Sequence, residues 1–349
     1  MIASLLVLSC EKSESTDHLM PDDNISFYVY DESFGEANTK AIVEDTQTMI
    51  NLGLPLHVVD MAGVNRGDNS INGDPVKYDS DTGLYRSNKT WNTSYNYEFY
   101  AYAMSEGKGS ETSVALFADY KGNKGHSVDI YQPTAYTHND DAWSDYLLSY
   151  RTPAVGSQKP LVRLEMERIT TGVELYISTP EGSEAIVTAI EFTDITRSMR
   201  HTISNHAVTD PNLSGIRNTW MLQPIAGATS PVVNYSRNET IHVVAKSESD
   251  DRFDSKFLMM RFIAVKQSAV GKLLKITYRI NEKGSSDIDD WAIYHAEFNL
   301  SLTDVPTWEI GRKTRYYISL DTSVELEGVI AEWKYIDYVE GTFLPSITQ

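Results

Sequence analysis

Apolar and polar residues alternate with a period of two along most of the chain, which predicts β-strands separated by short polar turns. The clearest case is the segment 25–30, where Ile25, Phe27 and Val29 share one face. Further segments of this kind cover 54–59, 97–103, 161–166, 173–177, 185–190, 241–245, 257–265, 273–280, 292–300, 316–320 and 324–338. Strands that recur at about ten-residue spacing in both halves indicate an all-β fold built from two β-sandwiches.

Turn signals refine this picture. The sequence Asp79-Ser80-Asp81-Thr82-Gly83 lies between two short alternating segments and predicts a β-hairpin. Short helical turns are expected only near residues 141–150. The alternation stops around residues 195–215, where His, Asn, Asp, Pro and Gly gather, so the best position for a domain boundary lies there.

The single cysteine, Cys10, follows a short apolar run and precedes a polar stretch. This order resembles a bacterial lipoprotein signal, in which Cys10 becomes the lipidated first residue of the mature protein. The alternative is an apolar N-terminus with an incidental cysteine. The expected organisation is a signal at 1–10, a polar tether at 11–23, an N-terminal sandwich at 24–200 and a C-terminal sandwich at 201–349.

Charge and composition exclude several functions. The 30 basic and 49 acidic residues give a formal net charge of −19, and such a surface repels nucleic acid. The eight histidines show no spacing typical of a metal site. Neither a nucleophile motif nor a phosphate-binding glycine loop occurs in the sequence. We therefore expect a protein without enzymatic activity, cofactor or metal.

Four segments in consecutive order carry a family resemblance. They are 91–104, which contains Tyr97-Glu98-Phe99-Tyr100-Ala101-Tyr102; 145–148 with 161–177; 257–267 with 273–280; and 308–320 with 329–333. Together they resemble the fimbrillin (type V pilin) family of Gram-negative anaerobes of the gut and mouth. The resemblance implies two tandem transthyretin-like β-sandwich domains, exported as a lipoprotein precursor to the outer membrane and the cell surface.

The resemblance also implies a maturation step. In that family a trypsin-like protease cuts in the loop after the first strand, and the position that corresponds here is Lys40. Ile25, Phe27 and Val29 would belong to the strand that is removed. The alternative is that the segment 25–30 is an ordinary edge strand that stays in place.

Polymerisation into a fimbria would follow, because a neighbouring subunit fills the groove by donor-strand exchange. The partners implied are therefore other pilin subunits, in a homopolymer or a heteropolymer. The candidate donor-strand residues lie in the C-terminal tail and are Ile336, Tyr338, Phe343 and Leu344. The alternative for this tail is a last strand that pairs within its own domain.

A different function remains open from the sequence. A monomeric surface lipoprotein that binds glycan would need exposed aromatic side chains, and the candidates are Trp91, Trp143, Trp220 and Trp291. A host protein is a further possible partner, since Arg66-Gly67-Asp68 matches the tripeptide that integrins bind.

Overall fold

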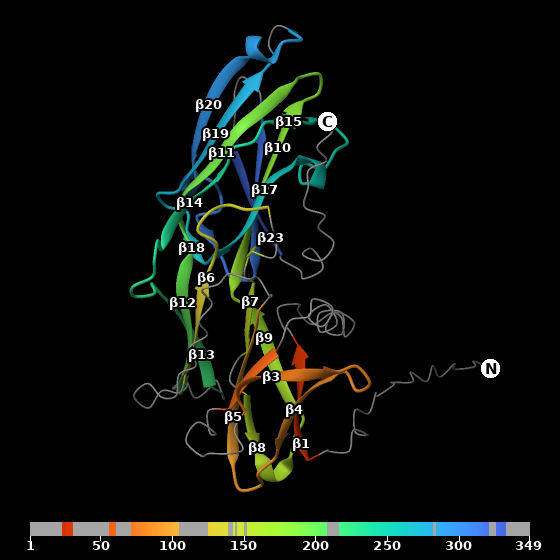
Figure 1. Ribbon diagram of the computed structural model, residues 1–349, viewed down its shortest axis with the longest axis vertical. Coiled ribbons are helices and arrows are strands. Elements are labelled where there is room, and N and C mark those ends of the chain that lie inside the picture. Colours follow the sequence, from red (N-terminus) through yellow and green to blue (C-terminus); the bar gives the residue numbers. More distant parts are fainter. Residues whose placement is uncertain are drawn as a thin grey trace, which may run out of the picture.

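The computed structural model describes residues 23–30, 56–60, 71–104, 125–138, 142–143, 145–149, 152–207, 216–281, 284–320 and 326–332. These residues form strands and short 3-10 turns, so the predicted all-β class is confirmed. The strands build a lower and an upper unit that follow one another along the longest axis of the molecule (Figure 1). Cys10, Lys40, the tripeptide at 66–68 and the C-terminal tail lie outside the described residues.

The lower unit is a ring of strands. Its members are β1 (Asn24–Tyr30), β2 (Leu56–Asp60), β3 (Asn72–Asp79), β4 (Leu84–Thr90), β5 (Asn96–Met104), β7 (Tyr146–Ser149), β8 (Thr152–Val155) and β9 (Val162–Arg168). They pair in the order β2-β3-β4-β1-β9-β7-β5-β8, and an additional pairing of β2 with β5 closes the ring. The predicted hairpin is present as the antiparallel pair β3–β4. Closure matters because it leaves few open strand edges.

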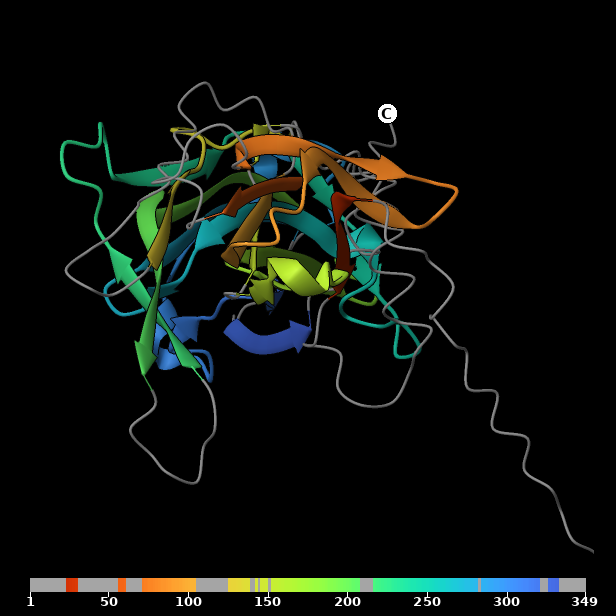
Figure 2. The same ribbon diagram turned by 90° about the horizontal axis from the view of Figure 1, so that it is seen from below.

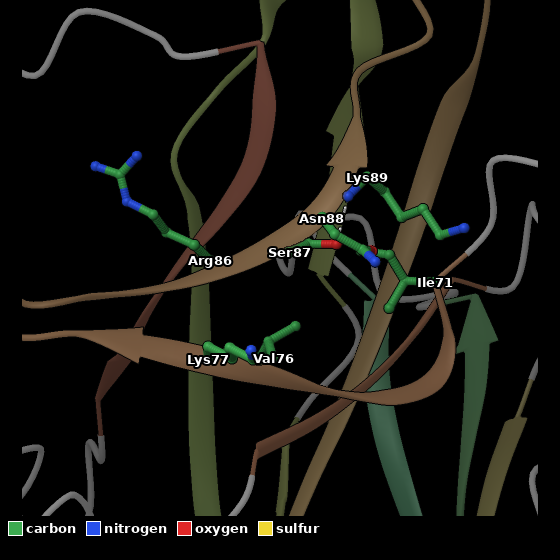
Figure 3. A pocket seen from close by; sticks show the side chains of 7 residues that line it. All are labelled: Ile71, Val76, Lys77, Arg86, Ser87, Asn88 and Lys89. Atoms are coloured by element: carbon green, nitrogen blue, oxygen red, sulfur yellow. Dashed lines mark hydrogen bonds between the residues drawn. The ribbon is translucent and has the colours of Figure 1, made fainter.

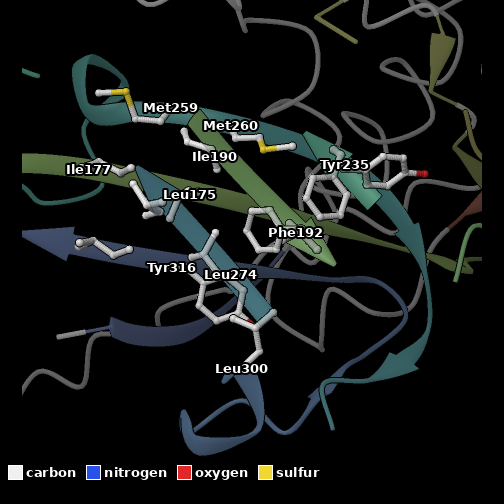
Figure 4. Packing of buried hydrophobic residues seen from close by; sticks show 14 of the residues in the cluster. Leu175, Ile177, Ile190, Phe192, Tyr235, Met259, Met260, Leu274, Leu300 and Tyr316 are labelled. Atoms are coloured by element: carbon white, nitrogen blue, oxygen red, sulfur yellow. The ribbon is translucent and has the colours of Figure 1, made fainter. Parts of the chain in front are cut away.

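The upper unit is a sandwich of two sheets. One sheet contains β10 (Thr170–Pro180), β16 (Ala245–Lys246), β17 (Leu258–Val265), β22 (Arg312–Ser319) and β23 (Leu326–Glu332). The other contains β11 (Ala185–Thr196), β14 (Val232–Arg237), β15 (Ile241–Val243), β19 (Leu273–Ile280) and β20 (Ala292–Asn299). Side chains from both sheets, among them Leu175, Phe192 and Tyr316, interdigitate in one core (Figure 4).

Smaller elements join the two units. A third sheet is formed by β6 (Gly125–Tyr131), β12 (Ser198–Ala207) and β13 (Ile216–Gln223), and a two-stranded ribbon by β18 (Gln267–Ser268) and β21 (Thr307–Trp308). The short 3-10 turns are η4 (Gly156–Gln158), η5 (Ser255–Phe257), η6 (Ile288–Asp290) and η7 (Leu300–Leu302). A small apolar cluster packs between elements of both units, with Tyr146 from β7 and Val265 from β17 among its members.

The chain passes directly from one unit to the other through β9 and β10, with only Ile169 between them. The backbone N–H of Ile169 donates to the carbonyl of Tyr146 at 3.0 Å. Beside it, buried Arg168 forms an ion pair of 2.9 Å with buried Asp145, which also accepts a hydrogen bond from Thr170. Since the two charges are paired with one another, the crossing buries no uncompensated charge.

β10 is the central strand of the upper unit and is buried on both faces. Its Glu174 forms ion pairs with Lys313 at 3.1 Å, Arg315 at 3.1 Å and Arg261 at 3.7 Å. The Tyr176 hydroxyl also donates to this carboxylate at 2.7 Å. Burial alone would raise the pKa of Glu174, but the three cations and this hydrogen bond outweigh it and lower the pKa.

Two sequence expectations differ from the structure. Residues 198–207 form strand β12, with His201 buried, although a loop was expected there. Residues 146–149 form strand β7, although helical turns were expected there. The reason is that both segments lack a clean alternation, since inward positions carry polar groups in β12 and all four residues of β7 are buried.

The change from the apolar cluster of the lower unit to that of the upper unit also comes earlier in the chain than the predicted domain boundary. Met166 belongs to the cluster of the lower unit, whereas Val173 belongs to that of the upper unit. β10 and β11 therefore contribute their apolar faces to the upper core, about thirty residues before the boundary expected between 200 and 201. The 24–200 and 201–349 limits remain a prediction about domains.

Candidate strand-exchange site

The first strand, β1, lies inside its sheet rather than at an edge. It pairs antiparallel with β4, with Phe27 opposite Tyr85. On its other side it pairs parallel with β9, with Phe27 opposite Val162 and Val29 opposite Leu164. β1 thus satisfies two rows of backbone hydrogen-bonding groups at once, which no edge strand does.

One face of β1 is fully buried. Ile25, Phe27 and Val29 have relative exposures of 1%, 0% and 1% and belong to the apolar cluster of the lower unit. These are the three residues that the sequence analysis assigned to the removable strand. Burial of three such side chains stabilises the unit by roughly 5–9 kcal/mol before the ordering of the chain is counted.

Phe27 rests against a group of aromatic rings. Its ring meets that of Phe99 edge-to-face, with centroids 5.3 Å apart. Phe99 in turn stacks on Tyr97 at 5.5 Å and meets Trp91 at 5.9 Å. Edge-to-face and offset contacts of this kind add to the burial of the rings. The position of Phe27 is therefore a pocket shaped for an aromatic side chain.

A hydrogen bond and an ion pair hold the beginning of β1 at the lower end of the molecule. The carbonyl of Asp23 accepts a 2.9 Å hydrogen bond from the backbone N–H of Trp91, and its carboxylate pairs with Lys159. Neither Asp23 nor Lys159 was singled out in the sequence analysis. Because the two residues are distant in the sequence, no local pattern could have revealed their contact.

The outer face of β1 is only partly covered. Ser26 and Tyr28 are half-buried, and the Arg163 guanidinium lies over the Tyr28 ring at 5.8 Å from its centroid. A strand with one buried face and one partly solvent-exposed face depends mainly on its inward side chains for stability. Another strand with the same alternation could take its place with little cost on the outer side.

Removal of β1 would open the ring at one place. β4 and β9 would each present an unpaired row of backbone groups, and the pockets of Ile25, Phe27 and Val29 would be open between them. Such an edge beside an apolar cleft is a template for a strand from another chain. The intact ring lacks this template because β1 fills it.

Tyr85, the partner of Phe27 on β4, has a buried hydroxyl with no hydrogen-bond partner among the described residues. Burial, with a smaller contribution from neighbouring Tyr78, raises the pKa of Tyr85 to about 12. The hydroxyl therefore stays neutral over the physiological pH range. The wall of the slot beside β1 is consequently uncharged at this position.

A pocket of about 400 Å³ lies on the far side of β4, where β3 and β4 diverge (Figure 3). It is lined by apolar Ile71 and Val76 and by the cations Lys77, Arg86 and Lys89, among other residues. The charged ends of Arg86 and Lys89 point away from one another (Figure 3), and Arg86 pairs with Asp79 at 2.8 Å. Arg86 and Lys89 therefore do not converge on one point of the pocket.

The tryptophans do not form a platform for sugars among the residues whose side chains are described. Trp91, Trp143 and Trp291 are buried, and the side chain of Trp220 lies outside the described set. In the described part of the chain, no group of three or more His, Cys, Asp or Glu side chains could hold a metal ion. A search of the same residues finds no helix that is long and apolar enough to span a membrane.

Comparison with known proteins shows the fold. The chain is similar to a fimbrial protein from Bacteroides vulgatus, with 14% identity, a TM-score of 0.50, and coverage of 90% of this chain and 100% of the other. It is also similar to a protein assigned provisionally to cell adhesion from Bacteroides ovatus (12% identity, TM-score 0.44, 89% and 97% covered). A fimbrial assembly protein from Parabacteroides distasonis follows at 10% identity and a TM-score of 0.34, with 88% and 95% covered.

No model of a known protein family and no curated protein matches the chain. The likeness to the Bacteroides vulgatus protein shows a shared fold, and it extends over nearly the full length of both chains.

Proposed function

We propose that this protein is a structural subunit of a cell-surface fimbria that mediates adhesion and polymerises by donor-strand exchange. The observation that carries this proposal is the position of β1, an interior strand whose buried residues and two neighbours form a complete slot. The shared fold with a fimbrial protein supports the same function. The chain would act as a binding and building element, without catalysis.

Maturation would proceed in three steps. Cys10 would be lipidated and would anchor the precursor in the outer membrane. Cleavage after Lys40 would then separate β1 from the body, because Lys40 follows β1 in the chain. The slot would finally receive a strand from another subunit, and the candidate donor residues remain Ile336, Tyr338, Phe343 and Leu344.

The closed ring gives this order a physical reason. Before cleavage the slot is filled within the same chain, so the effective concentration of β1 far exceeds that of any donor. After cleavage β1 is held by non-covalent contacts alone. A donor with more inward side chains, or one that reaches the slot from an adjacent subunit, can then replace it.

Limited trypsin treatment of the purified precursor tests the proposal. We expect a cut near Lys40 and a resistant body that forms ladders on SDS gels without heating. A Lys40→Gln variant serves as the matched control and should remain intact and monomeric. A body that stays monomeric after the cut at Lys40 contradicts the proposal.

A further inference from the structure

Strand β20 (Ala292–Asn299) forms one edge of the upper sandwich. Its sheet has the order β14-β11-β19-β20, so β20 pairs with β19 on one side, and no strand of the described residues pairs with its other side. Figure 1 shows β20 at the outer margin of the upper unit. Its eight residues pair with β19 without a register shift. β20 therefore presents a regular row of backbone groups that another strand can use.

This edge lacks the features that usually protect an edge strand from pairing. β20 contains no proline and no lysine, and its ladder with β19 has no bulge. The opposite margin of the same sheet is less regular. It is divided between β14 and β15, and the β11–β14 ladder shifts register between Phe192 and Ile195. Of the two margins, β20 is therefore the one suited to strand addition.

The backbone groups that face the free edge follow from the ladder. The N–H of Leu300 donates to the carbonyl of Lys272 at 3.1 Å, and this pair continues the register in which Leu273 lies opposite Asn299. In an antiparallel ladder every second pair exchanges backbone hydrogen bonds. The even-numbered residues of β20 therefore bond to β19, and the odd-numbered residues turn their backbone groups to the free edge. These are Ile293, His295, Glu297 and Asn299.

The inward side chains of β20 are incompletely covered. Tyr294, Ala296 and Phe298 pack against the core of the upper sandwich but are only half-buried. Tyr294 stacks on Tyr278 of β19, with ring centroids 5.4 Å apart. The apolar core thus reaches solvent along this edge. A strand added beside β20 would bury these side chains further, which favours addition.

Exposed aliphatic side chains lie at both ends of the edge. Ile293, near the start of β20, is 55% exposed, and Leu302, just after its end, is 84% exposed. An antiparallel partner of the same sequence brings the start of one strand against the end of the other. Ile293 of each copy then lies on the side of the contact where Leu302 of the other copy lies. Exposed apolar residues around an open edge are typical of a protein contact.

We propose that β20 of one copy pairs antiparallel with β20 of a second copy, with Ala296 opposite Ala296 on a twofold axis. The odd-numbered residues then form the hydrogen-bonded pairs across the contact, because their backbone groups face the free edge. The contact uses the same surface of both copies and closes as a dimer. The two sheets join into one, and the half-buried inward faces of both β20 strands become continuous.

The side chains select this register. On the outer face, His295 of each copy lies opposite Glu297 of the other. On the inner face, Tyr294 lies opposite Phe298, and aromatic pairs across strands stabilise a sheet. A twofold axis at His295 or at Glu297 would instead place two like residues opposite each other. Two carboxylates in such a position repel one another.

Both outer residues have contacts within their own copy that leave room for the partner. The Nδ1 atom of His295 forms a 3.1 Å hydrogen bond with the Thr277 hydroxyl, so its Nε2 atom is the nitrogen that faces the partner's carboxylate. Glu297 has a long ion pair of 3.8 Å with Lys275, and a carboxylate accepts several hydrogen bonds at once. His295 and Glu297 are both exposed.

The β20 contact and the strand-exchange site share no strand. β1 belongs to the lower unit, which faces the viewer in Figure 2, whereas β20 lies in the upper unit (Figure 1). The β20 contact joins copies side by side through a shared sheet. The inference therefore goes beyond the proposed function and can be tested without it.

Disulfide trapping tests the register. In a full-length Cys10→Ser background, Ala296→Cys places two cysteines opposite each other at a non-hydrogen-bonded pair, with Cα atoms about 4.5 Å apart, a distance that a disulfide can bridge. Ala292→Cys is the matched control, because it changes the same residue type on the same face of β20. In the proposed register its two copies lie about 27 Å apart along the ladder. After mild oxidation we expect a disulfide-linked dimer of Ala296→Cys and at least tenfold less of Ala292→Cys.

A charge swap provides a second measurement. His295→Glu in the Ala296→Cys chain should lower the rate of dimer formation about tenfold, because two opposite-charge pairs become two like-charge pairs. Adding Glu297→His exchanges the two residues and should restore the rate. A defect in the fold of the single variant would not be repaired by the second change, so the swap reports on the contact itself.

The outcomes separate the contact from the alternatives. Equal dimer yields from Ala296→Cys and Ala292→Cys, or no dimer from Ala296→Cys, overturn the β20 pairing, and so does a swap that fails to restore the rate. Sedimentation of the unchanged chain adds a readout without cysteines, since its dimer fraction should rise with concentration and fall in His295→Glu. A chain that sediments as a monomer at all concentrations also overturns the pairing.

This inference and the proposed function can fail separately. Ladders that form after trypsin cleavage while Ala296→Cys gives no dimer leave strand exchange standing and reject the β20 pairing. A specific Ala296→Cys dimer in a chain that never forms ladders rejects strand exchange and supports the β20 pairing.

Discussion

β1 and β10 occupy the same kind of position in the two units, yet they differ in length and in burial. Each is an interior strand with an antiparallel neighbour on one side and a parallel neighbour on the other. β1 has seven residues and one half-exposed face, whereas β10 has eleven and is buried on both faces. β1 is held mainly by its apolar face, whereas β10 also carries Glu174, whose charge is neutralised by Lys313, Arg315 and Arg261. This difference is why β1, and not β10, is the strand that we propose is replaced.

The neighbours of each strand in the chain differ as well. β10 continues directly from β9 and turns into β11 through the short segment 181–184. β1 is separated from β2 by residues 31–55, which include Lys40. A single cut there would leave β1 without a covalent link to the body, while a cut beside β10 would divide the core of the molecule.

The largest effect is expected from a loss of apolar volume in either strand. Phe27→Ala and Leu175→Ala should each lower the free energy of unfolding of the intact chain by about 3–5 kcal/mol, because each leaves a cavity in a closed core. Urea denaturation followed by tryptophan fluorescence measures this. Tyr28→Ala, on the half-buried face of β1, is the control and should cost less than about 1.5 kcal/mol.

The same two variants distinguish the role of β1 from that of β10 after assembly. Once trypsin has cut the chain and a donor has replaced β1, Phe27→Ala should have no effect on the stability of the polymer, whereas Leu175→Ala should keep its full effect. Equal losses in both assembled variants would show that β1 stays in its slot.

A smaller effect is expected from the charge that distinguishes β10. Glu174→Gln leaves Lys313 and Arg261 without their buried counter-charge and should cost about 3 kcal/mol at neutral pH. Glu309→Gln is the control, since its ion pair with Lys266 is only partly buried and should contribute less than about 1 kcal/mol.

The Glu174 effect should depend on pH. Because the pKa of Glu174 in the folded state lies below its ordinary value of 4.5, its stabilising contribution is complete above that value and is lost as the pH falls through the folded-state pKa. Thermal unfolding between neutral and acidic pH should therefore show a smaller decline for Glu174→Gln than for the unchanged chain. Parallel curves for the two proteins would contradict this role of Glu174.

The smallest effect concerns the wall of the β1 slot. Tyr85→Phe removes a buried hydroxyl that has no partner among the described residues, so the free energy of unfolding should stay the same or rise by up to about 1 kcal/mol. Tyr97→Phe is the control, because the Tyr97 hydroxyl accepts a 2.8 Å hydrogen bond from the Asn92 N–H and its loss should destabilise the chain by about 1 kcal/mol. A marked loss with Tyr85→Phe would indicate that its hydroxyl has a partner.

The sequence was informative about strands and less so about their order. Period-two alternation identified β1 and its inward residues, and a turn sequence identified the β3–β4 hairpin. The sequence did not predict β12, because its buried positions include the polar residues His201 and Ser198. Alternation reports how a residue faces the core, so it fails where a strand buries polar groups or both faces.

The neighbours of β1 could not be predicted for a different reason. An interior strand and an edge strand can have the same alternation, and for residues 25–30 the sequence analysis considered a removable strand and an ordinary edge strand that stays in place. The pairing with β9 connects residues far apart in the chain, and the contact of Asp23 with Lys159 is equally distant. Long-range pairing depends on the whole fold, which no short segment encodes.

The parallel pairing of β1 with β9 also has a consequence for the time course of folding. Phe27 and its neighbour Val162 are 135 positions apart, and at about 5–20 residues per second the ribosome needs about 7–27 s to make the chain between them. β1 therefore stays without its second neighbour for several seconds after it has been made. During that time the backbone groups of β1 that later pair with β9 have no partner from that strand, and such an unpaired edge favours contacts with other chains.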